Sequence, residues 1–281
     1  MKKIIGWFEG SWGSEEELLR PLINQGVNRG NGIFETILIL NGQPKLLNEH
    51  IKRWHKSSLL LKMKKPPSEE LIHRLIQDAV SRIGLEKQDG FVRLNWCNNN
   101  IELQGYINQA EKISGNKDHD FWLEISFQKP YFKPISTLIS RNERRNPHSL
   151  LSQCKSFNYL QSIQAKKEAL LAGCDDALLL NTNGQLCCGT TSNILVRRRG
   201  EWLTPNLNTG CLAGIMRQQG LESGLIREAK VEIKPEVGDE WLLINSLSCR
   251  PIISVNNYKL KEYKKAKELW ISLLKAQKKQ V

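Results

Sequence analysis

Residue types that bind an anion recur at two separated places in this sequence. His50 and Arg53 stand three residues apart in NEHIKRW, which puts both on one face of the helix that the apolar spacing of 46–63 predicts. The planar guanidinium of Arg53 suits a pair of phosphate oxygens, whereas His50 is expected to support the helix. Further along, GCLAGIMRQ predicts a helix that begins at Gly214 or Ile215, and the N–H groups and positive dipole end of such a helix favour an anion. Both segments therefore carry groups that favour a bound anion.

The elements that must carry these residues alternate between strands and helices. In the first half, β-branched and aromatic runs predict strands and helical apolar spacing predicts helices: strands at 3–8, 33–40, 90–97 and 121–128, and helices at 46–63 and 68–84. Asn41-Gly42 is a hairpin signal, and Ser68 is expected to cap the second helix. The second half predicts helices at 158–172, from Gly214 or Ile215, and from about 260, with strands at 175–181, 185–197, 201–204, 239–245 and 251–255.

Length and composition indicate a globular chain with two lobes. The sequence has 281 residues, of which 40% are hydrophobic and 25% charged, and its mean hydropathy is −0.42. At roughly 100 to 200 residues per domain, this length favours two lobes with a cleft between them. We place the domains at 1–120 and 121–281, because a long polar loop and FQKPYFKP indicate a boundary near 115 to 135. No run approaches the about 20 apolar residues of a membrane span, and Glu9 interrupts the short apolar N-terminus, so we expect a cytoplasmic protein that binds no membrane.

Charge and cysteine content narrow the possible partners. With 41 Lys plus Arg against 29 Asp plus Glu, the net charge of +12 could attract nucleic acid or steer a small anionic substrate. Apart from basic runs at Arg141–Arg145, Arg197–Arg199 and the C-terminus, the basic residues are scattered, and no nucleic-acid motif accompanies them. We therefore expect a solvated basic surface and a small anionic substrate. A non-catalytic nucleic-acid-binding protein is the alternative of a different class. Seven cysteines without paired CxxC spacing predict reduced thiols, with neither a disulfide framework nor a metal site.

Four segments in this order and spacing resemble one family of enzymes. They are GNGIFET with NEHIKRW, CKSFNYL, LLLNTNGQLCCGTTSNILV and LTPNLNTGCLAGIMRQ. From about residue 26 to 255 the chain is similar to the fold-type IV pyridoxal-phosphate enzymes, the class IV aminotransferase family of branched-chain and D-amino-acid aminotransferases and aminodeoxychorismate lyase. The resemblance implies a two-lobed α+β fold of the D-amino-acid-aminotransferase type, with a small α/β N-terminal domain and a larger C-terminal domain containing a β-barrel-like sheet. It also implies pyridoxal 5'-phosphate as the cofactor and a homodimer.

The resemblance assigns cofactor contacts residue by residue. CKSFNYL matches the family's lysine segment, so Lys155 is expected to form the Schiff base with the cofactor aldehyde and to move protons at the attacked carbon; a surface lysine at a strand end is the alternative. Tyr159 matches a tyrosine that hydrogen-bonds the cofactor's phenolic oxygen, with a packing role as the alternative. Arg53 is the phosphate arginine by resemblance. The other expected phosphate contacts are Gly214, Ile215, Met216 and Ser246, with Asn245 facing phosphate or substrate; a plain turn is the alternative for Ser246.

Cys188 departs from the family pattern. In GQLCCGTTSN it stands where the family has a glutamate that hydrogen-bonds the pyridine nitrogen and keeps it protonated. No Asp or Glu occurs from Ala177 through Gly200, so a one-residue shift restores no carboxylate. A thiol favours a neutral pyridine unless the cofactor's positive charge draws out a thiolate, and either state weakens the electron sink. Whether Cys187 or Cys188 points inward stays open, since neighbours on a regular strand face opposite ways.

The remaining details favour one branch of the family. Arg93 in FVRLNW is expected to bind a substrate carboxylate, with a strand arginine paired to an acidic neighbour as the alternative. Asn31 and Glu35 are interpreted as structural, Glu35 as a partner of backbone or helix-end groups. Met216 stands where aminotransferases of the family often have Thr, and GIMRQ and INSL look closest to aminodeoxychorismate lyase. That activity releases pyruvate from 4-amino-4-deoxychorismate to give 4-aminobenzoate for folate synthesis. The alternatives are a class IV aminotransferase for branched-chain or D-amino acids and a degenerate non-catalytic relative.

Overall fold

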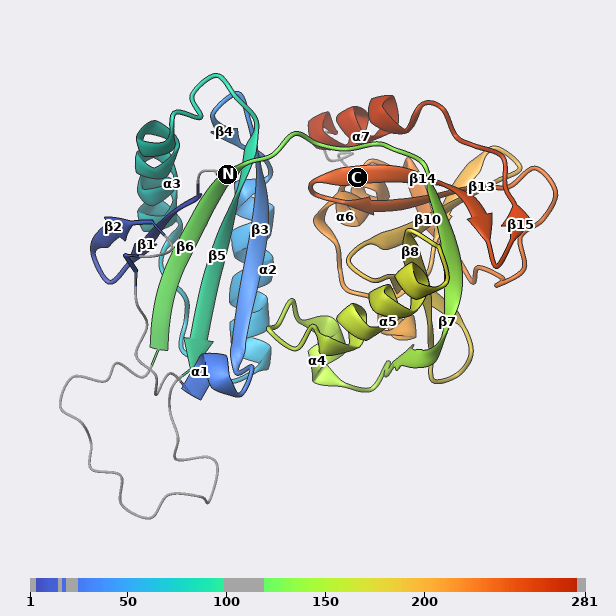
Figure 1. Cartoon of the computed structure of the whole chain (residues 1–281), viewed down its shortest axis with the longest axis horizontal. Helices are drawn as coiled ribbons and strands as arrows, with labels where there is room; N and C mark the ends of the chain where they lie inside the picture. Colours follow the sequence, from blue (N-terminus) through green and yellow to red (C-terminus); the bar gives the residue numbers. More distant parts are fainter. Residues whose placement is uncertain (1–3, 15–16, 19–24, 99–118, 277–281) are drawn as a thin grey trace, which may run out of the picture. The chain divides into compact units, whose positions relative to one another are not determined.

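The chain consists of two units, and unit 1 includes a short segment whose sequence neighbours on both sides belong to unit 2. The computed structural model describes residues 4–14, 17–18, 25–98 and 119–276 (Figure 1). Unit 1 comprises residues 1–129 together with 154–158, and unit 2 comprises 130–153 and 159–281. The boundary expected at residue 120 therefore lies inside a strand of unit 1, and Lys155 belongs to unit 1 rather than to the C-terminal lobe.

Unit 1 is built on a six-stranded antiparallel sheet in the order β2-β1-β6-β5-β3-β4. Its strands are β1 (Ile4–Phe8), β2 (Ser11–Gly13), β3 (Gly32–Leu40), β4 (Gln43–Pro44), β5 (Gly90–Asn98) and β6 (His119–Phe127), and the short helix α1 (Gln25–Asn28) precedes β3. The predicted hairpin joins β3 to β4, with φ angles of 48° at Asn41 and 72° at Gly42. A two-residue hairpin turn of type I′ needs positive φ at both positions, and Asn-Gly meets this need at little cost.

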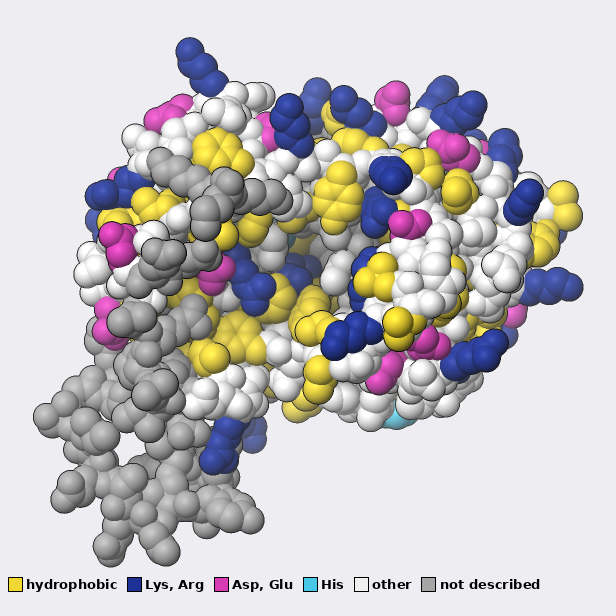
Figure 2. All heavy atoms as spheres, in the orientation of Figure 1, with side chains coloured by type: hydrophobic (Ala, Val, Ile, Leu, Met, Phe, Trp, Pro, Cys, Tyr) yellow, Lys and Arg dark blue, Asp and Glu magenta, His cyan; other side chains and the backbone are white. Residues whose placement is uncertain are grey.

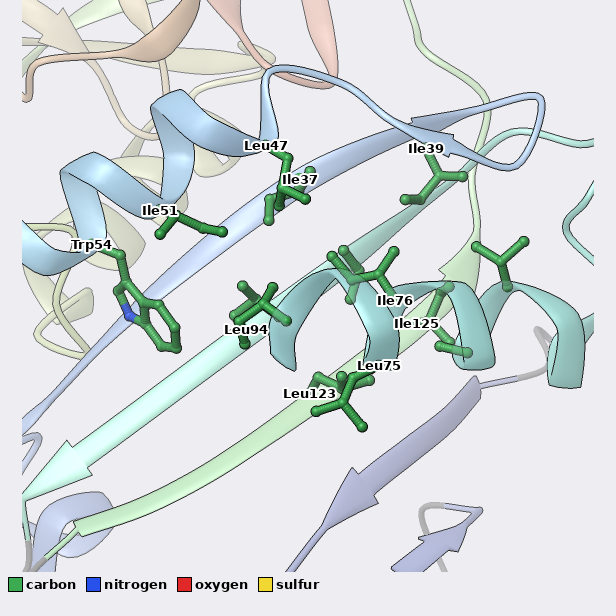
Figure 3. Packing of buried hydrophobic residues seen from close by; sticks show 14 of the residues in the cluster. Ile37, Ile39, Leu47, Ile51, Trp54, Leu75, Ile76, Leu94, Leu123 and Ile125 are labelled. Carbon is green, nitrogen blue, oxygen red and sulfur yellow. The ribbon is translucent and has the colours of Figure 1, made fainter. Parts of the chain in front are cut away.

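Helices α2 (Leu47–Leu60) and α3 (Glu69–Ile83) pack on one face of this sheet, and their apolar side chains form a core with β3, β5 and β6 (Figure 3). The buried residues labelled there are Ile37, Ile39, Leu47, Ile51, Trp54, Leu75, Ile76, Leu94, Leu123 and Ile125. Ser68 caps α3 as predicted, accepting from the Leu71 N–H at 3.4 Å. Burial of each large aliphatic side chain contributes on the order of 2 kcal/mol. The packing therefore fixes the rotation of α2 on β3, and with it the directions of His50 and Arg53.

Unit 2 contains a closed ring of six strands. The order β9-β8-β7-β14-β13-β10 closes where β10 pairs with β9, while β11 and β12 extend the sheet beyond β10. The strands are β7 (Ile135–Arg145), β8 (Asp176–Asn181), β9 (Leu186–Gly189), β10 (Asn193–Arg198), β11 (Glu201–Thr204), β12 (Ile226–Glu228), β13 (Glu240–Asn245), β14 (Ser248–Val255) and β15 (Tyr258–Lys259). The helices are α4 (Leu150–Gln153), α5 (Leu160–Leu171), η2 (Leu207–Thr209), α6 (Ile215–Glu222) and α7 (Ala266–Lys275). The predicted α+β fold with a β-barrel-like sheet is confirmed.

Three elements of unit 2 differ from the sequence predictions. The sequence does not predict β7, because its second half, SRNERR, has no apolar alternation; β8 and β14 hold it by parallel pairing on both sides. The strand expected at 185–197 is divided into β9 and β10 by a turn in which the Gly189 N–H donates to the Ser192 carbonyl at 2.8 Å. The last helix begins at Ala266 instead of about 260, because β15 and a turn precede it.

The charged side chains are spread over the surface. On the face in Figure 2, Lys and Arg side chains lie among acidic and uncharged ones and form no single continuous patch. All seven cysteines are free thiols. Within the ranges that the structure describes, no helix combines the length and apolar character that a membrane span requires.

Candidate active site

Lys155 lies on a short segment that pairs with strand β3 of unit 1. The Phe34 N–H donates to the Lys155 carbonyl and the Phe157 N–H donates to the Gly32 carbonyl, both at 2.8 Å. A Cβ at Gly32 would lie 2.2 Å from the Phe157 ring, so this position requires glycine. These contacts fix the half-buried Lys155 on unit 1, although the helix that follows it, α5, belongs to unit 2.

Phe34 brings Lys155 and Arg93 close together. The Lys155 Nζ lies 4.1 Å from the centroid of the Phe34 ring, and the Arg93 Cζ lies 3.9 Å from the same centroid. The two cationic groups are therefore no more than about 8 Å apart. Arg93 Nε also donates to Asn95 Oδ1 at 2.8 Å, which fixes the guanidinium plane. A carboxylate held by Arg93 would thus lie within reach of the lysine amine.

Glu35, His50 and Arg53 form a buried ion-pair network between β3 and α2. Arg53 donates from Nε to Oε1 of Glu35 (2.7 Å) and from Nη2 to Oε2 (2.5 Å), and His50 Nδ1 lies 2.7 Å from Oε2. The side chains of Glu35 and His50 are 1% exposed, and that of Arg53 is 12% exposed. Glu35 therefore contacts side chains of α2 rather than the backbone or helix-end groups that the sequence suggested. This bidentate pair orients the guanidinium of Arg53.

Burial and neighbouring charges set the ionisation of this network. Burial opposes ionisation of Glu35, but the charge of Arg53 and the hydrogen bonds with His50 and Arg53 prevail and lower its pKa to about 2. Burial lowers the pKa of His50, and the positive charges of Arg53 and Lys155 act in the same direction. His50 is therefore neutral near pH 7 and donates its Nδ1 proton to the carboxylate.

In unit 2, helix α6 begins beside an asparagine side chain. Gly214 is the N-cap, as predicted, and the first N–H groups of α6 belong to Ile215 and Met216. Asn193 Nδ2 donates to the Leu212 carbonyl at 2.9 Å, and a Cβ at Gly214 would lie 1.8 Å from Asn193 Oδ1. Glycine therefore lets Asn193 hold the loop that leads into the helix. The Met216 side chain is 1% exposed, so at this helix end Met216 offers its backbone N–H and no side-chain donor.

Tyr159, Asn245 and Ser246 also lie in unit 2. Asn245 accepts from the Leu247 N–H (2.8 Å) and donates to Ser192 Oγ (3.1 Å), which fixes the turn between β13 and β14. Ser246 is the first residue of that turn, and Tyr159 is the N-cap of α5. The hydrogen bonds of the Asn245 side chain therefore have a structural role in the turn. The cofactor contacts expected of Ser246 and Tyr159 stay predictions.

A β-bulge places Cys187 and Cys188 on the same side of β9. Leu179 pairs with Cys188 and Leu180 pairs with Leu186, so Cys187 is the additional residue. Both cysteines belong to one buried cluster with Ala165 and Ala169 of α5. The alternation expected for a regular strand does not hold at this bulge, and both thiols point into the same cluster.

Cys188 has charged neighbours of both signs. The hydrogen bond from Cys187 and the positive charge of Arg145 lower the pKa of Cys188, against the effects of burial and of Asp176. The same thiol pair raises the pKa of Cys187. Sequence analysis assigns no role to Arg145, because the basic run Arg141–Arg145 is interpreted as solvated surface. No local signal separates this arginine from its neighbours in the sequence.

Known proteins share this architecture and sequence pattern. The sequence model of the family described as amino-transferase class IV matches residues 32–255. A putative branched-chain-amino-acid aminotransferase of Methanocaldococcus jannaschii is 27% identical over 232 residues, 82% of this chain and 77% of the relative. A putative aminodeoxychorismate lyase of Schizosaccharomyces pombe is 26% identical over 247 residues, 85% of this chain and 96% of the relative. The solved branched-chain aminotransferase of Thermoproteus uzoniensis has a TM-score of 0.81 at 22% identity, covering 98% of this chain and 96% of that one.

The chain belongs to the class IV aminotransferase family, whose members are pyridoxal-phosphate enzymes. The predicted family, fold type and cofactor are thereby confirmed. Its residues fit most groups of the cofactor. Unit 1 offers the half-buried amine of Lys155 and the guanidinium of Arg53, which Glu35 orients. Unit 2 offers the start of helix α6, where Gly214 has no side chain and the backbone lies directly against Asn193. The ring nitrogen is the exception, because residues 177–200, which include β9, contain no Asp or Glu.

Proposed function

We propose that this enzyme is an aminodeoxychorismate lyase, which eliminates pyruvate from 4-amino-4-deoxychorismate to give 4-aminobenzoate for folate synthesis. The observation that carries the proposal is the thiol of Cys188 on β9, in a stretch from Ala177 to Gly200 that contains no Asp or Glu. A thiol stabilises a protonated ring nitrogen less than a carboxylate does, so the cofactor is a weaker electron sink. The elimination tolerates this loss better than transamination does, because its product ring becomes aromatic.

The residues of the chain divide the work of the reaction. Pyridoxal phosphate supplies a covalent attachment for the substrate amine and an electron sink. Lys155 would hold the cofactor, take the proton from the carbon that bears the amine, and return a proton as pyruvate leaves. Arg93 would hold a substrate carboxylate, since its guanidinium is fixed within about 8 Å of the Lys155 Nζ.

The groups proposed to contact the phosphate are a charged side chain, backbone N–H groups and a hydroxyl. Arg53 would bind the phosphate with an orientation imposed by Glu35. The first N–H groups of α6, at Ile215 and Met216, would donate to it, as would Ser246. Tyr159 would hydrogen-bond the phenolic oxygen of the cofactor. Each of these contacts rests on the match between this sequence and the family's segments.

The test is a direct assay of the product. The purified protein with pyridoxal phosphate and enzymatically prepared aminodeoxychorismate should form 4-aminobenzoate, followed by its fluorescence, without any keto acid. Lys155→Ala should abolish the product, whereas Lys167→Ala, at an exposed lysine of α5, should leave it unchanged. Amino transfer that requires a keto acid, with no 4-aminobenzoate, would replace the lyase by a class IV aminotransferase, the reaction named for the Methanocaldococcus jannaschii relative. Neither activity would indicate a degenerate relative.

We further propose that the protein acts as a homodimer in the cytoplasm. Apolar side chains exposed on and next to α4 and α5 support a protein contact there: Leu150, Leu151, Leu160, Ile163, Leu170 and Leu171. Light scattering of the purified protein should give twice the mass of the chain. A monomer at micromolar concentration would contradict the proposal.

A further inference from the structure

Four side chains of strands β5 and β6 share the face of the unit 1 sheet opposite to the one that α2 and α3 cover. On β5, Arg93 and Asn95 alternate with Leu94, which belongs to the core under the helices. In the register with β6, Arg93 lies directly opposite Glu124, and Asn95 lies directly opposite Trp122. Since directly opposed residues lie on the same face of a sheet, these four side chains are neighbours.

The side-chain amide of Asn95 joins a guanidinium to a carboxylate. Its Oδ1 accepts from Arg93 Nε at 2.8 Å, and its Nδ2 donates to Glu124 Oε1 at 3.4 Å. A guanidinium has no acceptor and a carboxylate has no donor, so only one orientation of the amide satisfies both neighbours. The same oxygen of Glu124 accepts from Trp122 Nε1 at 3.1 Å. The amide is therefore fixed with its oxygen toward Arg93.

Asn95 orients Arg93 without adding a negative charge. Its side chain is 1% exposed, and a buried amide lowers stability unless its polar atoms are hydrogen-bonded, as they are here. An aspartate has the same shape but would form an ion pair with the guanidinium. The Phe34 ring, whose centroid lies 3.9 Å from Arg93 Cζ, is a second uncharged contact. Both contacts fix the guanidinium and leave its positive charge in place.

We propose that Asn95 is a positioning residue that makes Arg93 selective for a carboxylate group of the substrate. The inference rests on the substrate-binding role proposed for Arg93 and not on the lyase reaction. A substrate carboxylate gains a charge-assisted hydrogen bond from the guanidinium, whereas an uncharged group of the same shape gains less. Glu124 and Trp122 act through the amide of Asn95, because they keep its oxygen and not its NH2 group toward Arg93.

The test exchanges the amide and the carboxylate. The double variant Asn95→Asp with Glu124→Gln keeps one group of each kind and the net charge, but it places the carboxylate next to Arg93. The probes are pyruvate, the carboxylate product of the proposed reaction, and its uncharged analogue pyruvamide. Each is titrated against the full chain loaded with pyridoxal phosphate, and binding is followed by NMR of the ligand. The double variant should bind pyruvate at least tenfold more weakly than the wild-type protein does, and pyruvamide within about twofold.

The single variant Asn95→Ala tests the same contact without a new ion pair. It should weaken pyruvate binding about fivefold and leave pyruvamide binding within about twofold, since the guanidinium loses the acceptor that orients it. Arg93→Met should remove the preference for pyruvate over pyruvamide. Gln88→Ala, at an exposed amide of the same unit, is the matched control and should change neither affinity.

The ratio of the two affinities separates positioning from packing. Equal weakening of pyruvate and pyruvamide binding in the Asn95 variants would assign Asn95 a packing role and overturn the proposal. A double variant that keeps the wild-type preference would also overturn it, as would a wild-type protein with no preference for pyruvate. The expected affinities without formation of 4-aminobenzoate would support the proposal and refute only the lyase function.

Discussion

The substitution Glu35→Gln removes the charge that holds His50 and Arg53 between β3 and α2. The carboxyl is 1% exposed, and its pKa is about 2 against an ordinary value of 4.5. This difference corresponds to roughly 3 kcal/mol of folding free energy at neutral pH. Loss of one partner of a buried ion pair costs a similar amount, about 3 to 5 kcal/mol, because the other charge stays buried. We therefore expect Glu35→Gln to destabilise unit 1 by about 3 kcal/mol near pH 7.

The effect should depend on pH with a defined sign. Because the folded state has the lower pKa, the Glu35 contribution is present above about pH 4.5 and is lost as the pH falls toward 2. The wild-type protein should lose stability over this range, and the difference between it and Glu35→Gln should shrink. Urea unfolding combined with hydrogen exchange of peptides from α2 measures the stability of unit 1 directly.

Glu86→Gln is the control, since Glu86 is an exposed carboxyl of the same unit. It should change the free energy of unfolding by less than about 0.5 kcal/mol. Equal stability of Glu35→Gln and the wild-type protein at pH 7, or an unchanged difference at pH 3, would refute the electrostatic account of this network.

Two further substitutions test the cofactor and substrate contacts. Gly214→Ala should weaken pyridoxal-phosphate binding at least tenfold in a fluorescence titration, because its Cβ would lie 1.8 Å from Asn193 Oδ1. Asn193→Ala should remove that clash. A double variant that binds the cofactor no more tightly than Gly214→Ala would therefore contradict the steric explanation. Arg93→Met should raise KM for the carboxylate substrate at least tenfold while cofactor affinity stays within about twofold, since a charged hydrogen bond contributes about 1.5 to 3 kcal/mol. Arg82→Met, at an exposed arginine of α3, is its control, and equal KM values in the two variants would exclude Arg93 from substrate binding.

Local chemistry made part of the fold predictable. Asn41-Gly42 specifies a hairpin turn, Ser68 specifies a helix N-cap and Gly214 marks the start of α6, because each of these signals acts within a few residues. The motif around Lys155 likewise indicated the family. These features depend little on the rest of the chain.

Features set by distant pairing were not predictable. Strand β7 exists because β8 and β14 pair with it, and Lys155 lies in unit 1 because its segment pairs with β3. The bulge that turns Cys187 and Cys188 to one side arises from the register between β8 and β9. Such contacts carry no signal in the nearby sequence.

The central claim is that Lys155, held against β3 of unit 1, carries the cofactor. Borohydride reduction of the protein incubated with pyridoxal phosphate, followed by peptide mass spectrometry, locates the attachment site directly. We predict one phosphopyridoxyl group, on the peptide that contains Lys155, and none in Lys155→Ala. A specific label on another lysine, or no label in the wild-type protein, would contradict this account.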